Sequence, residues 1–168
     1  MAFDTFLKLE GPNVAGESTD ATHAGEFEIY SFSFGASNPV TIGSGSTGSS
    51  GGKVSVSSFN IMKKTDKASP ILFSMCAKGE HFDKATVTLR KAGGAGGQQE
   101  YLVYTFEKVF VESIQWSGST GGDDTPTESM SLAFGTFSIS YSPQKAEDGS
   151  LDAAVVAGWD LTTNTEKA

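Results

Sequence analysis

The chain is poor in cysteine, in arginine and in charge overall. Of its 168 residues, 19% are charged, and 12 Lys and Arg stand against 20 Asp and Glu, which gives a formal net charge of -8. The single cysteine, Cys76, excludes an intrachain disulfide and a zinc site built on several cysteines. The single arginine, Arg90, argues against nucleic-acid binding, because neutralising phosphates requires clustered Lys and Arg.

Long apolar runs are absent as well. The longest, residues 153–157, is far too short to cross a bilayer, so the sequence predicts no membrane insertion. Residues 1–8 lack the basic and then apolar run that is typical of a signal peptide. We therefore expect synthesis and folding in the cytoplasm, which does not fix where the protein ends up.

Glycine and serine, in contrast, are plentiful. The 20 glycines and a similar number of serines make up about a quarter of the chain. A hydrophobic content of 38%, with 12 phenylalanines, is enough to build a core, so the composition indicates a folded chain. We expect one domain over residues 1–168, with a flexible Gly/Ser-rich loop at about residues 38–53. Long loops inside a compact domain are usually functional.

Most of the chain shows the alternation of apolar and polar residues that is typical of β-strands. In residues 30–35, three aromatic residues alternate with two serines and a glycine, which places rings and hydroxyls on opposite faces. The alternation changes phase at Gly135-Thr136 and between Val56 and Phe59, and each change predicts a bulge or kink. Bent strands suit a closed or nearly closed barrel.

One helix is indicated at about residues 69–78. Ser69 is a suitable N-cap, Pro70 fits the first helical position, and Gly79 follows as a stop. Between these signals, three residues fall on one face at i, i+3 and i+4: Leu72, Met75 and Cys76. The predicted fold class is therefore all-β with one helix, an antiparallel β-barrel-like domain of two sheets with a single flanking α-helix.

No catalytic, cofactor or metal site is predicted. The GxGxxG match at residues 43–48 and the GxSxG match at residues 48–52 lie in a Gly/Ser tract, without the strand-to-helix context that either motif needs. His23 and His81 have no partnering motif nearby, so a structural role at a strand or loop end is favoured for both. The sequence therefore does not indicate an enzyme.

Eight blocks of sequence stand out, in order along the chain: residues 6–9, 16–18, 22–35, 63–81, 86–93, 100–102, 128–141 and 158–161. Together these blocks resemble the Hcp family, the tube protein of bacterial type VI secretion systems. One departure is Phe32 and Phe34, which stand where relatives often carry tryptophan.

This resemblance implies a ring former. Six copies would make a homo-hexameric ring with an open channel, and rings would stack into a tube inside a contractile sheath, with a spike protein at the tip. Contraction would expel the tube into the medium or a target cell without a signal peptide. The resemblance also implies that small effector proteins are held inside the ring.

Two sets of residues are candidates for these roles. Ser31 and Ser33 face away from the aromatic side of their strand; an ordinary polar face and a channel lining fit that pattern equally, and the resemblance favours the lumen as a cargo surface. The loop at residues 38–52 resembles the family's extended loop that reaches toward a neighbour, although a harmless insertion is an alternative. Its candidates for ring stacking or the subunit interface are Asn38, Val40, Ile42 and Lys53.

A second class of function stays open. A monomeric binding module, such as a carbohydrate or protein adaptor on a β-sandwich, would fit the strand pattern without tube assembly. The two classes differ in oligomeric state, because a tube component must form rings and an adaptor need not.

Overall fold

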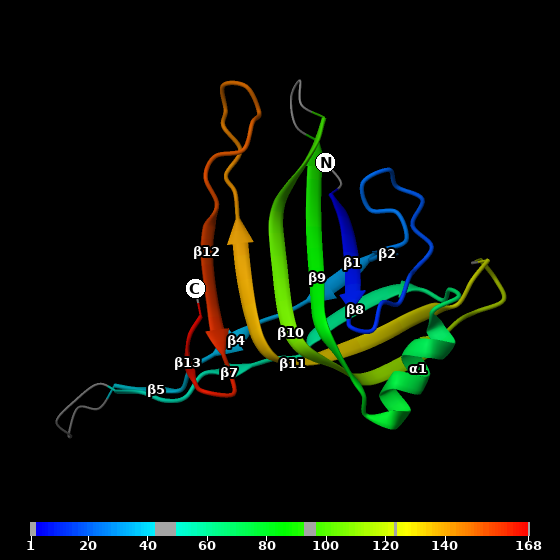
Figure 1. The fold of residues 1–168 in the computed structure, drawn as a ribbon, viewed down its shortest axis with the longest axis horizontal. Helices are drawn as coiled ribbons and strands as arrows, with labels where there is room; N and C mark the ends of the chain where they lie inside the picture. Colours follow the sequence, from blue (N-terminus) through cyan, green and yellow to red (C-terminus); the bar gives the residue numbers. More distant parts are fainter. Residues whose placement is uncertain (1–2, 43–49, 93–96, 123, 168) are drawn as a thin grey trace.

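The structure, a computed structural model, describes residues 3–42, 50–92, 97–122 and 124–167. Strands dominate these ranges, with one helix beside them (Figure 1). The elements in chain order are β1 (Asp4–Glu10), β2 (Phe27–Glu28), β3 (Ser31–Ser33), β4 (Ala36–Ser37), β5 (Val40–Thr41), β6 (Ser50–Gly51), β7 (Ser55–Val56), β8 (Phe59–Lys64), α1 (Ser69–Lys78), β9 (His81–Ala92), β10 (Gln98–Ser117), β11 (Thr127–Tyr141), β12 (Val155–Asp160) and β13 (Thr165–Glu166).

The main sheet is antiparallel and folds over itself into two layers. Its hydrogen-bonded order is β13-β12-β11-β10-β9-β1-β2, and β8 joins it by pairing with β11 on one side and β3 on the other. The N-terminal half of β11 pairs with β8, whereas its C-terminal half pairs with β12. The long β10–β11 hairpin therefore belongs to both layers, which meet at an angle (Figure 1). The predicted all-β, barrel-like fold with one helix is confirmed, and the strand order given above does not close into a barrel.

The bend in this hairpin lies near the predicted phase change. Pairing passes from Glu107–Thr136 to Val109–Phe134, and the intervening Lys108 has a positive φ of 53°, which is uncommon for a residue other than glycine. Gly135 lies opposite Lys108, so the kink expected near residues 135–136 is present. The register shift of this pair lies elsewhere, between Val111 and Ser113.

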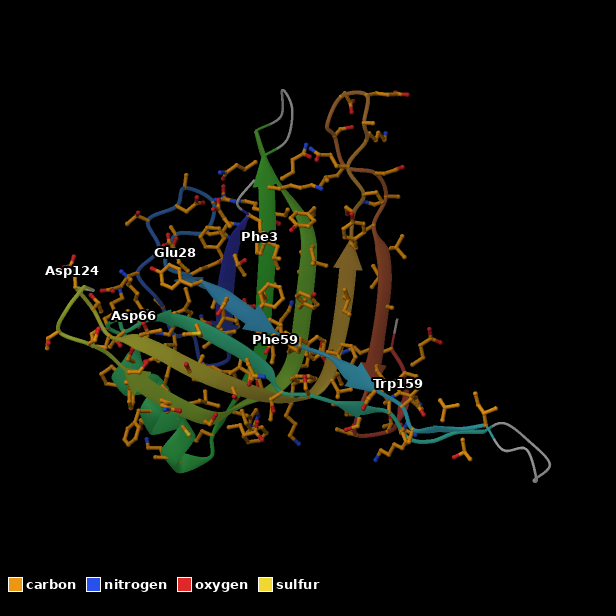
Figure 2. The ribbon with its side chains drawn as sticks, turned by 180° about the vertical axis from the view of Figure 1, so that it is seen from behind. Phe3, Glu28, Phe59, Asp66, Asp124 and Trp159 are labelled. Carbon is orange, nitrogen blue, oxygen red and sulfur yellow. The ribbon has the colours of Figure 1, made fainter. Side chains whose placement is uncertain are left out.

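The core lies between the two layers and is strongly aromatic. Phe59 and Phe106 are fully buried, with ring centroids 4.9 Å apart, and Phe134 packs 4.6 Å from Phe106. Figure 2 shows Phe59 near the centre, where the layers meet. Burying a phenylalanine side chain stabilises a fold by roughly 1.5–3 kcal/mol, so this cluster is a main source of the stability that holds the layers together.

The helix predicted at about residues 69–78 is confirmed, and so are two of its three boundary signals. Pro70 lies in the first turn, and Gly79 ends the helix in the left-handed conformation with a φ of 66°. The predicted N-cap is wrong by one position: Ala68 precedes the helix and Ser69 is its first residue. In the described chain no side chain caps the first turn of the helix; the Asp66 carboxylate instead accepts a hydrogen bond from the Ala68 N–H at 3.0 Å, just before the helix begins. Within the described ranges, no helix has the length and apolar character that a membrane span requires.

Candidate assembly surfaces

A polar face covers the outside of the layer formed by β3, β8 and the bent ends of β11 and β10. Alternation along each strand turns Phe32, Ile61 and Met130 toward the core and their neighbours outward. Strand register aligns the outward residues in two rows, which are Ser31, Met62, Ser129 and Gln115, and Ser33, Asn60, Ser131 and Ser113. We call these eight residues the polar face.

The polar face is a shallow hollow of about 380 Å³ lined by hydroxyl, amide and apolar groups. Asn60 links its strands: the Ser131 hydroxyl donates to Asn60 Oδ1 at 2.6 Å, and Asn60 Nδ2 donates to Ser33 Oγ at 3.4 Å. Ser31 and Ser33 are both exposed, on the side of the strand that the sequence predicted. The sequence did not identify Asn60, Met62 or Gln115 as their neighbours, because that requires the strand order.

A narrow ribbon projects from the body. β4 pairs with β7, and β5 pairs with β6 through Val40–Gly51 and Thr41–Ser50, so the segment predicted as a loop is partly strand at its base. The β5 end extends well beyond the two layers (Figure 1). Val40 is 61% exposed and Ile42 is 83% exposed. Residues 43–49, most of the Gly/Ser tract and its apparent motifs, lie outside the described residues.

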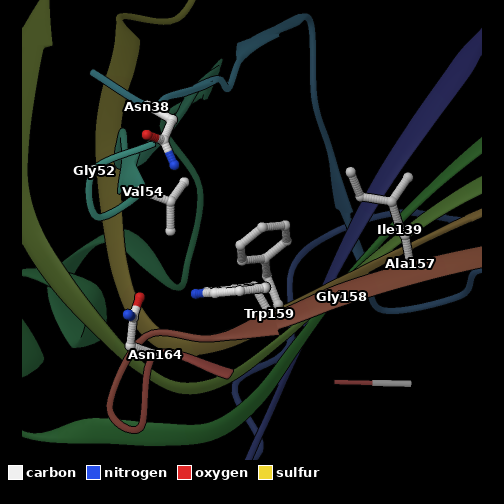
Figure 3. Close-up of a pocket in the computed structure, with 9 residues that line it drawn as sticks. Asn38, Gly52, Val54, Ile139, Ala157, Gly158, Trp159 and Asn164 are labelled. Carbon is white, nitrogen blue, oxygen red and sulfur yellow. The ribbon is translucent and has the colours of Figure 1, made fainter. Parts of the chain in front are cut away.

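An apolar groove of about 490 Å³ lies at the base of this ribbon (Figure 3). Apolar side chains from the ribbon, from β11 and from β12 line it, with asparagine amides among them. The lining residues are Asn38, Gly52, Val54, Phe137, Ile139, Ala157, Gly158, Trp159 and Asn164. The buried indole Nε1 of Trp159 has no hydrogen-bond partner among the described residues, which is uncommon for a buried donor. Lys53, the remaining candidate of the ribbon, is exposed.

The only arginine has a structural role. Arg90 is 5% exposed, binds both carboxylate oxygens of Asp20 at 2.9 and 2.6 Å, and reaches Asp4 at 3.2 Å. Its guanidinium lies 4.8 Å from the centre of the Phe6 ring. Hydrogen bonds from Arg90 and from the Thr22 N–H hold the pKa of Asp20 well below its usual range. These contacts fasten the segment before β2 onto β1 and β9.

His23 belongs to the same packed cluster. Its ring stacks on Phe6 with centroids 4.4 Å apart, and Nδ1 lies 2.9 Å from Glu26 Oε2. Nε2 lies 3.0 Å from a carboxylate oxygen of Glu100. His81 is separate from this cluster and packs against Phe110. In the described ranges, no three His, Cys, Asp or Glu side chains gather as they would around a metal ion.

A second buried ion pair joins β8 to β11. Lys63 is 1% exposed and Glu128 is 0% exposed, and Lys63 Nζ lies 2.5 Å from Glu128 Oε2. Lys63 also lies 3.2 Å from Asp66, while Trp116 Nε1 donates to Glu128 Oε1 at 2.6 Å. These contacts therefore hold β8 and β11 in their pairing and connect both strands to the segment that begins α1.

Comparisons with known proteins give matches to one family over nearly the whole chain. Residues 6–141 match the family described as "Type VI secretion system effector, Hcp". The chain is 39% identical over 166 residues to the protein hcp1 of Pseudomonas aeruginosa, with 99% of each chain covered. A solved type six secretion system protein is 35% identical with a TM-score of 0.90, covering 99% of this chain and 100% of its own.

A further solved structure, Hcp1 from Salmonella typhimurium, is 35% identical, with a TM-score of 0.79 and coverage of 99% of this chain and 100% of that one. The likeness thus extends over both layers, the helix and the ribbon segment. This chain belongs to the Hcp family of secreted type VI secretion proteins.

Proposed function

We propose that this protein is the structural tube component of a type VI secretion system. Six copies form a ring, rings stack into a tube within a contractile sheath, and a spike protein sits at the tip. Contraction of the sheath expels the tube into the extracellular space or a target cell. The observation that carries this proposal is the exposed ribbon: Val40 and Ile42 present apolar side chains far from the protein's own core, which favours contact with another subunit.

The polar face is the proposed lining of the channel, with Ser31 and Ser33 as cargo contacts. Its hydroxyl and amide groups offer hydrogen bonds to an effector protein. The hydrogen bonds that link Asn60 to Ser33 and to Ser131 hold these groups in place across three strands. A hydroxyl-lined wall binds modestly and leaves space for cargo, which suits a surface that must release what it carries.

The ribbon is the proposed subunit contact. Val40 and Ile42 supply apolar area, and Asn38 and Lys53 lie at its base. Since a ribbon from one copy would meet a different surface on the next, such contacts are head-to-tail. A head-to-tail contact closes into a ring when the rotation between copies allows it and otherwise gives an open filament.

Light scattering after size-exclusion chromatography tests the proposal. A tube component is expected at six times the chain mass of 17.6 kDa, and negatively stained particles should be rings with an open centre. A monomer at concentrations of tens of micromolar would contradict the proposal and favour the binding-module alternative.

A further inference from the structure

We infer that Met62 is the specificity-determining residue of the polar face, and that this face accepts an uncharged, extended peptide segment with an apolar side chain placed against Met62. The inference rests on the proposed channel lining and names the chemistry of the cargo that the lining accepts. It gives roles to Met62, Ser129 and Gln115, none of which the sequence pattern indicated as a binding residue.

The two rows of the polar face differ in how their polar groups are used. In one row, Asn60 accepts a hydrogen bond from Ser131 and donates one to Ser33, so these three side chains engage one another. The other row, which we call the Met62 row, consists of Ser31, Met62, Ser129 and Gln115. Within the part of the chain that the structure describes, its serine hydroxyls and its amide make no hydrogen bond. They are therefore available to a ligand.

Met62 places an apolar group in the middle of this row. Its side chain is 41% exposed, and Ser31 and Ser129 pair with it from the strands on either side. Methionine is flexible and polarisable, so it adapts to apolar partners of different shapes. The hollow is also lined by the core-facing residues Phe32, Ile61, Ile114 and Met130. An apolar site bordered by a few placed polar groups is the usual form of a binding pocket.

The polar face carries no charge, although the chain has a formal net charge of -8. None of its eight residues is Asp, Glu, Lys, Arg or His. Two exposed charged side chains of opposite sign border it: Lys64 lies two residues beyond Met62 on β8, and Glu112 accepts a hydrogen bond from Ser58 at the other end. A charged group placed over the middle of the face would lose water without gaining an opposite charge. The face therefore favours an uncharged partner.

The dimensions of the Met62 row fit an extended segment. The row crosses four strands, β3, β8, β11 and β10, which at about 4.8 Å per strand gives about 14 Å. An extended chain advances about 3.3 Å per residue, so about four residues span the row. The apolar side chain of such a segment meets Met62, while its peptide groups meet the Ser31 and Ser129 hydroxyls and the Gln115 amide. Because no ion pair forms, binding should not depend on ionic strength.

Methionine methyl NMR on the full chain tests this contact. The chain has four methionines; Met62 is exposed, whereas Met75 is buried in α1 and serves as an internal control. The probe is the neutral peptide acetyl-Gly-Ser-Leu-Ser-Gly-amide, titrated into protein labelled with ¹³C-methyl methionine. We expect a saturable shift of the Met62 signal with the same midpoint at about 50 and about 500 mM NaCl. The Met75 signal should not move.

Peptides and variants provide matched controls. Peptides with lysine or glutamate in place of leucine should bind about tenfold more weakly than the leucine peptide. With a fluorescein-labelled leucine peptide followed by fluorescence anisotropy, Met62→Leu should keep the affinity within about twofold, and Met62→Ser should lower it about tenfold. Met62 is exposed, so the fold should tolerate both changes, and circular dichroism checks that it does.

Light scattering on the same samples separates this inference from the proposed function. Rings in which the leucine peptide leaves the Met62 signal unmoved would overturn the Met62 row as a recognition site and leave the ring intact. Monomers that bind the peptide at Met62 would support the row and overturn the ring, and monomers that do not bind it would overturn both. Tighter binding of the lysine or glutamate peptide, or a midpoint that depends on salt, would overturn the uncharged partner.

Discussion

Arg90 holds Asp20 through two parallel hydrogen bonds, although the residues are 70 positions apart in the chain. The edge of the planar guanidinium donates both hydrogen bonds to the carboxylate, and one face of the guanidinium lies over the Phe6 ring. A lysine keeps the charge but loses the paired geometry and the stacking. We therefore expect Arg90→Lys to lower the midpoint of urea unfolding clearly, and Arg90→Ala to lower it further. Equal midpoints for Arg90→Lys and the wild type would contradict this assignment.

The contribution of the Arg90–Asp20 pair to stability should depend on pH. The pKa of Asp20 is lowered from its ordinary 3.8, first by the hydrogen bond from Arg90. A carboxyl with a lowered folded-state pKa stabilises the fold above its unfolded-state value, and this contribution is lost as pH falls through the folded-state pKa. The stability difference between wild type and Asp20→Asn should be full near about pH 7 and should shrink progressively below about pH 4.

Urea unfolding of both proteins at several pH values measures that difference. Other carboxyls with lowered pKa values, such as Asp160 and Glu107, titrate in both proteins and cancel. A difference that stays constant from neutral to acidic pH would show that the Asp20 charge does not stabilise the fold.

Breaking the buried ion pair of Lys63 and Glu128 should lower the free energy of unfolding strongly. Glu128→Ala leaves the Lys63 ammonium buried with Asp66 and the Lys64 carbonyl oxygen as its remaining partners, and should cost about 3–5 kcal/mol of unfolding free energy. The double variant Lys63→Met with Glu128→Leu removes both charges and should recover much of that loss. Urea unfolding followed by circular dichroism measures these variants and the single variants Lys63→Met and Glu128→Leu. A double variant as unstable as the sum of these two single variants would rule out a coupled pair.

The proposed channel lining can be tested with a larger side chain. Ser33→Gln fills space on the polar face while its exposed position spares the core. We expect the variant to form normal rings but to retain much less effector in co-purification, by about tenfold. Ser119→Gln, in the exposed turn between β10 and β11, is the control. Unchanged effector retention by Ser33→Gln would remove the cargo role from this serine.

Shortening the ribbon tests its part in assembly. Deleting residues 44–51 removes β6 and the segment before it, and takes away none of the buried core residues that the structure describes. Loop length itself has a small effect on stability, so thermal unfolding should change little while tubes seen by electron microscopy become short or absent. Normal tubes and normal secretion with this deletion would show that the ribbon is dispensable.

Residues with a strong local pattern were predictable from sequence. Alternation places Phe32 inside and Ser33 outside, and Pro70 and Gly79 bound the helix within a residue. The left-handed backbone of Lys108 could not be predicted, because lysine has no preference for that conformation and the bend of the whole hairpin imposes it. The kink was detectable from the phase change alone.

The groove was beyond sequence analysis for a different reason. Val54 lies just before β7, whereas Ile139 and Trp159 lie in β11 and β12, and none of the three carries a local sequence signal for a groove. Strand order brings them together, and strand order depends on long-range pairing that one sequence does not determine. Likewise, no local sequence pattern pairs Lys63 with Glu128; the register of β8 and β11 places them opposite one another.

The unbroken passage of β10 and β11 through both layers has a mechanical consequence. A thrust applied to one layer reaches the other along covalent backbone rather than across a packed interface, so the two layers move as one piece. The ladder between the two strands spans fourteen aligned pairs from Leu102–Tyr141 to Ser117–Thr127, and axial force along the strands would shear them together rather than unzip them one at a time. In the proposed tube, a subunit stiffened in this way would keep its shape while the tube is expelled.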